Sequence, residues 1–121
     1  MKWRSGAAAI VAAAVLAGCS VLGIGDVRVR IHNASALDFD SVLVSFPRDS
    51  ERYGAVDAGG RSRYATVAEA YAYAYVEVWV QQRRYEAIPI DWVGEERLSG
   101  GDYAYVIDVI DGQLHLELDR Q

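Results

Sequence analysis

The stretch Val27-Arg28-Val29-Arg30-Ile31-His32-Asn33 alternates apolar and polar side chains from end to end. Successive side chains of a β-strand point to opposite faces, so this alternation predicts a strand with one face on a core and the other toward water. The same period of two recurs along most of the chain that follows, and none of that chain shows a convincing helical period. The sequence therefore predicts an all-β fold.

Turn-forming residues divide the rest of the chain into further alternating runs. Strands are expected at residues 37–46, 62–67, 70–82, 85–92, 102–110 and 114–118, with a short extended piece at 53–56 and a polar loop at 48–51. Seven to eight short strands with regular turn signals are typical of an antiparallel β-sandwich, which we expect over residues 26–121.

Two local features refine this prediction. The apolar positions of residues 37–46 switch phase between Leu37/Phe39 and Val42, which predicts a bulge near Asp40-Ser41. The pair Asp111-Gly112 predicts a two-residue hairpin, because both residue types tolerate a positive φ. The strand after this hairpin should turn its leucines inward.

The run Leu98-Ser99-Gly100-Gly101-Asp102-Tyr103-Ala104-Tyr105 resembles the Gly-x-Tyr-x-Cys run of immunoglobulin domains, with Tyr105 in place of the cysteine. The resemblance implies a tyrosine corner, in which the hydroxyl of Tyr103 hydrogen-bonds back to the preceding loop. It favours an Ig-like sandwich, and a transthyretin-like sandwich fits the same strand pattern.

The N-terminal segment has a basic start, Met1-Lys2-Trp3-Arg4, and then an apolar run from Gly6 to Leu16, the layout of a secretory signal peptide. Its end, Leu16-Ala17-Gly18-Cys19, resembles the lipobox of bacterial lipoproteins. In that family the chain is cut before the cysteine, which then carries a diacylglycerol and a third acyl chain. The resemblance implies a signal helix at residues 1–18, lipid attachment at Cys19 and a short tether at 19–25.

The alternative for this segment is an uncleaved transmembrane helix, since residues 5–24 carry no charge and are long enough to span a bilayer. The Ala- and Gly-rich composition and the position of the only cysteine favour the lipoprotein. Ser20 is not the Asp that usually signals retention at the inner membrane. The resemblance therefore implies an outer-membrane anchor in the cell envelope, facing the periplasm.

Charge and composition exclude several function classes. Removing residues 1–18 takes away Lys2 and Arg4 and no acid, which leaves 10 basic and 17 acidic residues and a net charge of −7. Such a domain gains nothing from counterion release, so nucleic acid is a poor partner. Once Cys19 carries lipid, no thiol remains for a disulfide, a metal or a nucleophile.

The most unusual segment is the run of residues 70–80, in which alanines and valines occupy one face. The other face carries the aromatic stripe Tyr71, Tyr73, Tyr75 and Trp79, with Glu77 among the rings. A buried unpaired carboxylate is costly, so this face is expected to be at least partly wet. It is either a binding surface or a scaffold surface whose rings are covered by arginines, with Arg83-Arg84 as the expected source.

A second candidate is the segment around Asp91, Trp92 and Glu95, which combines an aromatic ring with carboxylates. These acids could act as an acid/base pair or as ligands of a hard cation. Nothing in the sequence builds a cleft around them, however, and an ordered loop at a strand end is the simpler interpretation.

The two histidines allow one metal hypothesis, a site formed by His32, His115 and Glu117. All three lie at polar positions of their strands, so solvated surface side chains explain them better. No catalytic motif and no phosphate-binding loop occurs. We therefore predict a protein that is not an enzyme, with no metal and no cofactor.

The sequence as a whole predicts a lipid-anchored, non-enzymatic binding or structural module of the cell envelope. It would contact the membrane through Cys19 and a protein partner through the aromatic stripe. The alternative is a glycan- or peptidoglycan-binding module that uses the same rings together with Asp91 and Glu95.

Overall fold

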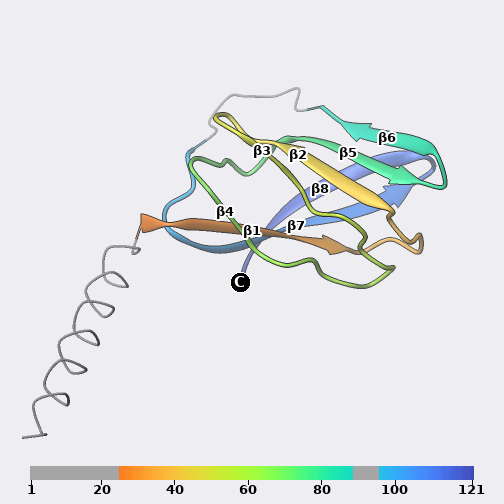
Figure 1. Cartoon of the computed structure of the whole chain (residues 1–121), viewed down its shortest axis with the longest axis horizontal. Coiled ribbons are helices and arrows are strands. Elements are labelled where there is room, and N and C mark those ends of the chain that lie inside the picture. The colour runs from red at the N-terminus through yellow and green to blue at the C-terminus, as the bar shows by residue number, and fades with distance from the viewer. Residues whose placement is uncertain (1–24, 89–95) are drawn as a thin grey trace, which may run out of the picture.

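The computed structural model describes residues 25–88 and 96–121, which form eight β-strands in two four-stranded sheets (Figure 1). The first sheet has the order β4-β1-β7-β8, from Ala65–Val67, Val27–Asn33, Gly101–Ile110 and Gln113–Arg120. The second sheet has the order β3-β2-β5-β6, from Ser50–Arg52, Ser41–Ser45, Tyr75–Val80 and Arg83–Ala87. The predicted all-β sandwich is confirmed.

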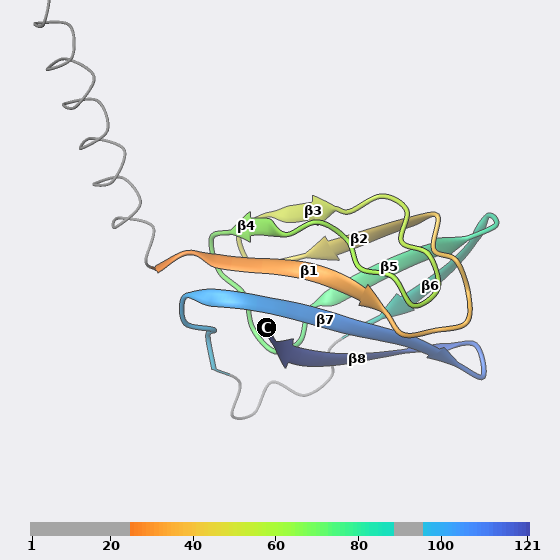
Figure 2. The same cartoon turned by 90° about the horizontal axis from the view of Figure 1, so that it is seen from below.

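The sheets are stacked as two layers. Figure 1 shows β2, β5 and β6 above β1 and β7, and Figure 2 looks onto the first sheet. All strand pairs are antiparallel except β1 and β7, which run parallel from Val27↔Gly101 to Asn33↔Ile107. The predicted antiparallel sandwich therefore holds for every strand pair except this one. Because the pair is parallel, β1 and β7 begin at the same end of the domain.

The core is built from the alternating positions that the sequence indicates. On β1 the side chains of Val29 and Ile31 are fully buried, while Arg28 on the opposite face is exposed. The second sheet contributes the fully buried residues Val42, Val44, Val76 and Val78. Each such side chain contributes about 1.5–3 kcal/mol when it leaves water, so the interleaved valines supply much of the driving force for stacking the two sheets.

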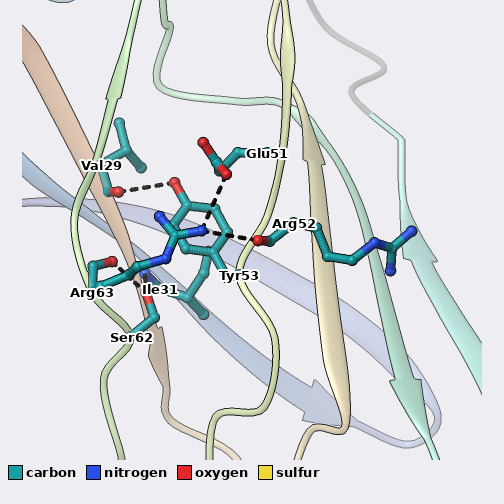
Figure 3. Close-up of polar contacts among 7 residues, drawn as sticks. All are labelled: Val29, Ile31, Glu51, Arg52, Tyr53, Ser62 and Arg63. Carbon is teal, nitrogen blue, oxygen red and sulfur yellow. Dashed lines mark hydrogen bonds and ion pairs between the residues drawn. The ribbon is translucent and has the colours of Figure 1, made fainter.

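The backbone of β1 needs partners on both sides, because the strand lies inside its sheet. β7 pairs along the whole of one side, but β4 pairs only with Val27, Arg28 and Val29 on the other. At Val29, the last residue of β1 that pairs with β4, the hydroxyl of Tyr53 also donates to the backbone carbonyl, at 2.8 Å (Figure 3). The backbone N–H of Ile31 donates to Ser62 Oγ at 2.8 Å, and Ser62 N donates back to the Ile31 carbonyl.

The end of β1 is held by the fully buried side chain of Asn33. Its amide nitrogen donates to the carbonyls of Leu37 and Val56, and its oxygen accepts from both the backbone N–H and the hydroxyl of Ser35. The Asn33 backbone also exchanges hydrogen bonds with Gly59 and Gly60. A buried amide with its hydrogen bonds made fixes the loop geometry at this end of the sandwich.

The tyrosine corner is confirmed. Tyr103 is fully buried, and its hydroxyl donates to the carbonyl of Ser99 at 2.7 Å. Tyr105, in the position of the immunoglobulin cysteine, is also fully buried, stacks on Phe46 of the facing layer and donates its hydroxyl to the carbonyl of Tyr71.

Two hairpin turns contain residues with a positive φ, in the left-handed region of the backbone. The predicted hairpin at Asp111 and Gly112 has φ values of 53° and 78° and joins β7 to β8. A second hairpin between β5 and β6 has Gln81 at 48° and Gln82 at 72°. Neither of its central residues is a glycine, so the sequence pattern does not predict this second hairpin. Asp40 supports it by accepting a hydrogen bond from the backbone N–H of Gln81.

Several predicted boundaries differ from the structure. Residues 48–51 are not wholly a loop, because β3 begins at Ser50 and pairs with β2. The strand expected at 70–82 begins only at Tyr75, because residues 70–74 cross between the sheets and are held by Leu98 N donating to the Ala70 carbonyl. The alternation of buried positions does change phase between Phe39 and Val42, as predicted. Leu37, however, is exposed and does not belong to the core.

In the described part of the chain, no helix has the length and apolar character needed to cross a membrane. The predicted signal helix and almost all of the tether lie outside the described residues, as do the last residues of the strand expected at 85–92.

The hydroxyl of Tyr53 gives the first testable prediction. Replacing Tyr53 with Phe removes the hydroxyl that donates to the buried carbonyl of Val29, so we expect the free energy of unfolding to fall by about 0.5–1.5 kcal/mol, the net contribution of a typical hydrogen bond. Urea denaturation of both proteins measures this difference.

Tyr73→Phe is the matched control, since the Tyr73 side chain is half exposed. Its effect should stay within about 0.5 kcal/mol, as for other surface substitutions. An equally small effect of Tyr53→Phe would contradict the proposed role of its hydroxyl.

Candidate functional site

The aromatic residues of β5 lie on the outer face of the second sheet, the side turned away from the first sheet. Val76 and Val78 point into the core, so Tyr75, Glu77 and Trp79 point outward. Directly paired residues of neighbouring strands share a face. The registers therefore place ten residues on this outer face: Ser41, Leu43, Ser45, Ser50, Arg52, Tyr75, Glu77, Trp79, Arg84 and Glu86.

A polar network joins four of these residues across β5 and β6. The hydroxyl of Tyr75 lies 2.6 Å from Glu77 Oε1 and 2.8 Å from Glu86 Oε2. Arg84 Nη1 donates to Glu77 Oε1 at 2.9 Å, and Arg84 Nη2 lies 3.7 Å from Glu86 Oε2. In the sequence, Glu77 stands among aromatic residues with no evident charge partner. In the structure, Arg84 neutralises its carboxylate.

This network changes the acidity of the phenol. The hydrogen bond to Glu77, followed by that to Glu86, raises the pKa of Tyr75 above its ordinary value of 10.0. Ionising the phenol would remove a donor from two carboxylates and add a third negative charge beside them. Tyr75 therefore remains a neutral donor throughout the physiological range of pH.

Trp79 is covered from β3. The guanidinium carbon of Arg52 lies 5.4 Å from the ring centroid, and Arg52 Nη1 donates to Ser41 Oγ at 2.8 Å. The sequence suggested Arg83 and Arg84 as the arginines over the rings. Arg83 instead stacks on Tyr85, and Arg84 is engaged by carboxylates. Arg52 directly follows residues 48–51, which the sequence predicts to be a loop, so it is not among the expected arginines.

The other two members of the aromatic stripe precede β5. Tyr71 is half-buried, its hydroxyl lies 2.7 Å from Glu69 Oε2, and its carbonyl accepts from Tyr105. Tyr73 has 51% of its surface exposed. The strand thus brings together only Tyr75 and Trp79, and the binding role of the four residues stays a prediction.

The described part of the structure does not assemble the remaining predicted sites. Cys19 and the loop residues Asp91, Trp92 and Glu95 lie outside the described residues. His32 lies on β1 and His115 on β8, with β7 between the two strands, so the first and last strands are not neighbours. Among the described residues, no three His, Cys, Asp or Glu side chains are grouped to hold a metal ion.

The electrostatics of His32 reflect its position among arginines. Partial burial and the charges of Arg61 and Arg30 lower its pKa below the ordinary value of 6.5. A neutral imidazole is therefore the main form near pH 7.

No family model matches the sequence, and no curated protein matches it. Solved structures with a similar fold include an NMR structure of a protein from Eubacterium rectale, with a TM-score of 0.59 and 10% identity over 82% of this chain and 93% of that one. They also include a proposed cell adhesion protein from Bacteroides uniformis, with a TM-score of 0.54 and 12% identity over 80% of this chain. This chain covers 50% of that second protein. At such identities the likeness establishes a shared fold alone.

The Tyr75 network gives the second testable prediction. We expect Glu77→Gln to lower the pKa of Tyr75 toward 10.0, because the substitution removes the larger of the two hydrogen-bonding causes and one negative charge. Titration followed by NMR of tyrosine Cζ resonances measures the change.

Glu69→Gln is the control, because Glu69 lies beside Tyr71 rather than Tyr75. It should leave the Tyr75 titration where it is in the wild type. A Tyr75 titration that does not respond to Glu77→Gln would show that Glu77 does not set it.

Proposed function

We propose that this protein is a non-enzymatic binding module of the cell envelope, anchored by lipid on Cys19. The module engages a protein partner through the outer face of the second sheet, with Trp79 and Tyr75 at its centre. The anchor rests on the lipobox resemblance. The partner surface rests on the composition and geometry of the outer face.

The observation that carries this proposal is the chemistry of a single sheet face. An antiparallel sheet that faces water usually shows polar side chains there. Seven of the ten residues on this face are polar or charged, and the other three are Trp79, Tyr75 and Leu43, which lie near Arg52 and Arg84. Trp, Tyr and Arg are the residue types enriched at protein interfaces and at their energetic centres. No strand of the described residues covers this face.

The shared fold with a proposed cell adhesion protein is compatible with a binding role. Adhesion needs no catalytic machinery, only an exposed surface on a stable scaffold. We carry over from that protein the general idea of a binding module and no particular partner.

A glycan is the second candidate, because the carboxylates of Glu77 and Glu86 lie at the hydroxyl of Tyr75, and carboxylates beside an aromatic ring can bind a sugar. Two observations favour the protein partner. The carboxylate oxygens already accept from Tyr75 and Arg84, and the ring of Trp79 is covered by Arg52. A sugar would have to displace these contacts, whereas a flat protein surface can pack over them.

The third testable prediction concerns this surface. The double variant Trp79→Ser/Tyr75→Ser should lose the crosslinked protein complexes that the wild-type chain forms in intact cells, because both ring contacts are removed. In-cell crosslinking followed by mass spectrometry measures the loss.

Tyr64→Ser is the matched control, since it removes a ring that lies between Arg28 and Arg30 on the other sheet. Its complexes should be unchanged. Retention of all complexes by the double variant would contradict the proposed surface, and wild-type binding to isolated peptidoglycan that the double variant loses would point to the glycan instead.

The fourth testable prediction concerns the anchor. The wild-type chain should be recovered from membranes with its N-terminus at Cys19 and a mass increment of lipid size, and Cys19→Ser should lack this increment. Intact-mass measurement and membrane partitioning of both chains test it. An unprocessed chain of unmodified mass in the wild type would contradict lipid anchoring.

A further inference from the structure

The edges of the two sheets differ in how they are protected against pairing with another chain. β3 and β4 have three residues each and β6 has five, and short edge strands are one common protection. β8 has eight residues, pairs with β7 in unbroken register from Ile110↔Gln113 to Tyr103↔Arg120, and contains no proline, lysine or bulge. β8 is therefore the least protected edge of the described strands.

The hairpin at Asp111 and Gly112 determines which backbone groups β8 leaves open. In a two-residue hairpin the flanking residues Ile110 and Gln113 form a hydrogen-bonded pair, and such pairs then alternate along the ladder. Gln113, His115, Glu117 and Asp119 thus use their backbone groups toward β7. The N–H and C=O groups of Leu114, Leu116 and Leu118 point to the other side, where no described strand pairs with β8.

The leucines of this strand are only partly covered. Leu114, Leu116 and Leu118 pack against the core but remain half-buried. β6 is the nearest strand of the second sheet, and an open hollow of about 570 Å³ lies between it and the start of β8, lined in part by Tyr85, Ile88 and Leu114. The apolar row along β8 therefore continues to the open edge of the first sheet.

We propose that β8 binds β8 of a second copy of this chain, antiparallel, with Leu116 opposite the partner's Leu116. This inference goes beyond the proposed function, because it uses the edge of the first sheet and not the outer face of the second. Pairing would satisfy the open backbone groups of both strands and join the two first sheets into one.

Charge complementarity determines the register. With Leu116 at the two-fold axis, His115 lies opposite the partner's Glu117, and Leu114 lies opposite the partner's Leu118 on the core side. Sliding the strands by two residues toward the C-terminus would place Glu117 opposite the partner's Glu117, and like charges directly opposite are unfavourable. Both registers pair residues whose backbone groups are open, so the charges decide between them.

Cysteine pairing tests this register. His115→Cys and Glu117→Cys are made separately in the full chain, since both side chains are exposed and the strand should tolerate either change. The pair lies in a non-hydrogen-bonded position, where Cα atoms approach to about 4.5 Å, within the range for a disulfide. We expect the mixture of the two variants to form a disulfide-linked dimer under mild oxidation.

Each variant alone is the control, because it carries the same Cys19 and only one new thiol. No dimer in the mixture beyond that of the single variants would overturn the proposal. A dimer of Glu117→Cys alone that equals the mixture would overturn the register.

A charge swap provides an independent test by analytical ultracentrifugation in detergent. His115→Glu and Glu117→His should each weaken the dimer by about tenfold, because each places like residues opposite one another in both symmetry-related pairs. The double variant His115→Glu/Glu117→His restores opposite pairing and should recover most of the affinity. A monomeric wild-type chain, or no recovery in the double variant, would overturn the proposal.

Discussion

The fold depends on the need to satisfy the backbone of β1 on both sides while its apolar side chains are fully buried. The parallel pairing with β7 supplies one side along all seven residues. β4 is too short to supply the other, so the hydroxyls of Tyr53 and Ser62 and the turn at Gly59 and Gly60 complete it. Tyr53 reaches β1 from the chain just after β3, which ties the two sheets together by a hydrogen bond as well as by apolar contact.

Position determines what each aromatic side chain does in this domain. Tyr53, Tyr103 and Tyr105 are buried, and each donates its hydroxyl to a backbone carbonyl. Tyr75 and Trp79 lie on the outer face of the second sheet, where Glu77 and Glu86 contact the Tyr75 hydroxyl and Arg52 lies over the Trp79 ring. The outer face of the first sheet holds its arginines differently, with Arg28 in an ion pair to Asp102. The two faces therefore offer different surfaces, and the one with Trp79 has the composition of an interface.

The local sequence pattern predicted much of this fold. Strand alternation, turn residues and the tyrosine corner each depend on residues that are close together in the sequence. The pattern gave the buried faces of β1 and β5, the hairpin at Asp111 and Gly112, and the hydrogen bond of Tyr103. It missed the parallel pairing of β1 with β7, the strand β3 and the late start of β5, because these depend on contacts between distant segments. At the candidate site it placed Tyr75, Glu77 and Trp79 on one face, whereas the cover from Arg52 follows from the register of β3 on β2 and could not be read from sequence.

The central claim is that the outer face of the second sheet is covered by a protein partner in the cell envelope. Hydroxyl-radical footprinting of Trp79, compared between intact cells and the purified chain, tests it most directly. We predict that Trp79 is oxidised in the purified chain and several-fold less in cells, while Tyr64, which precedes β4 of the first sheet, reacts equally in both. Equal oxidation of Trp79 in cells and in the purified chain would contradict it.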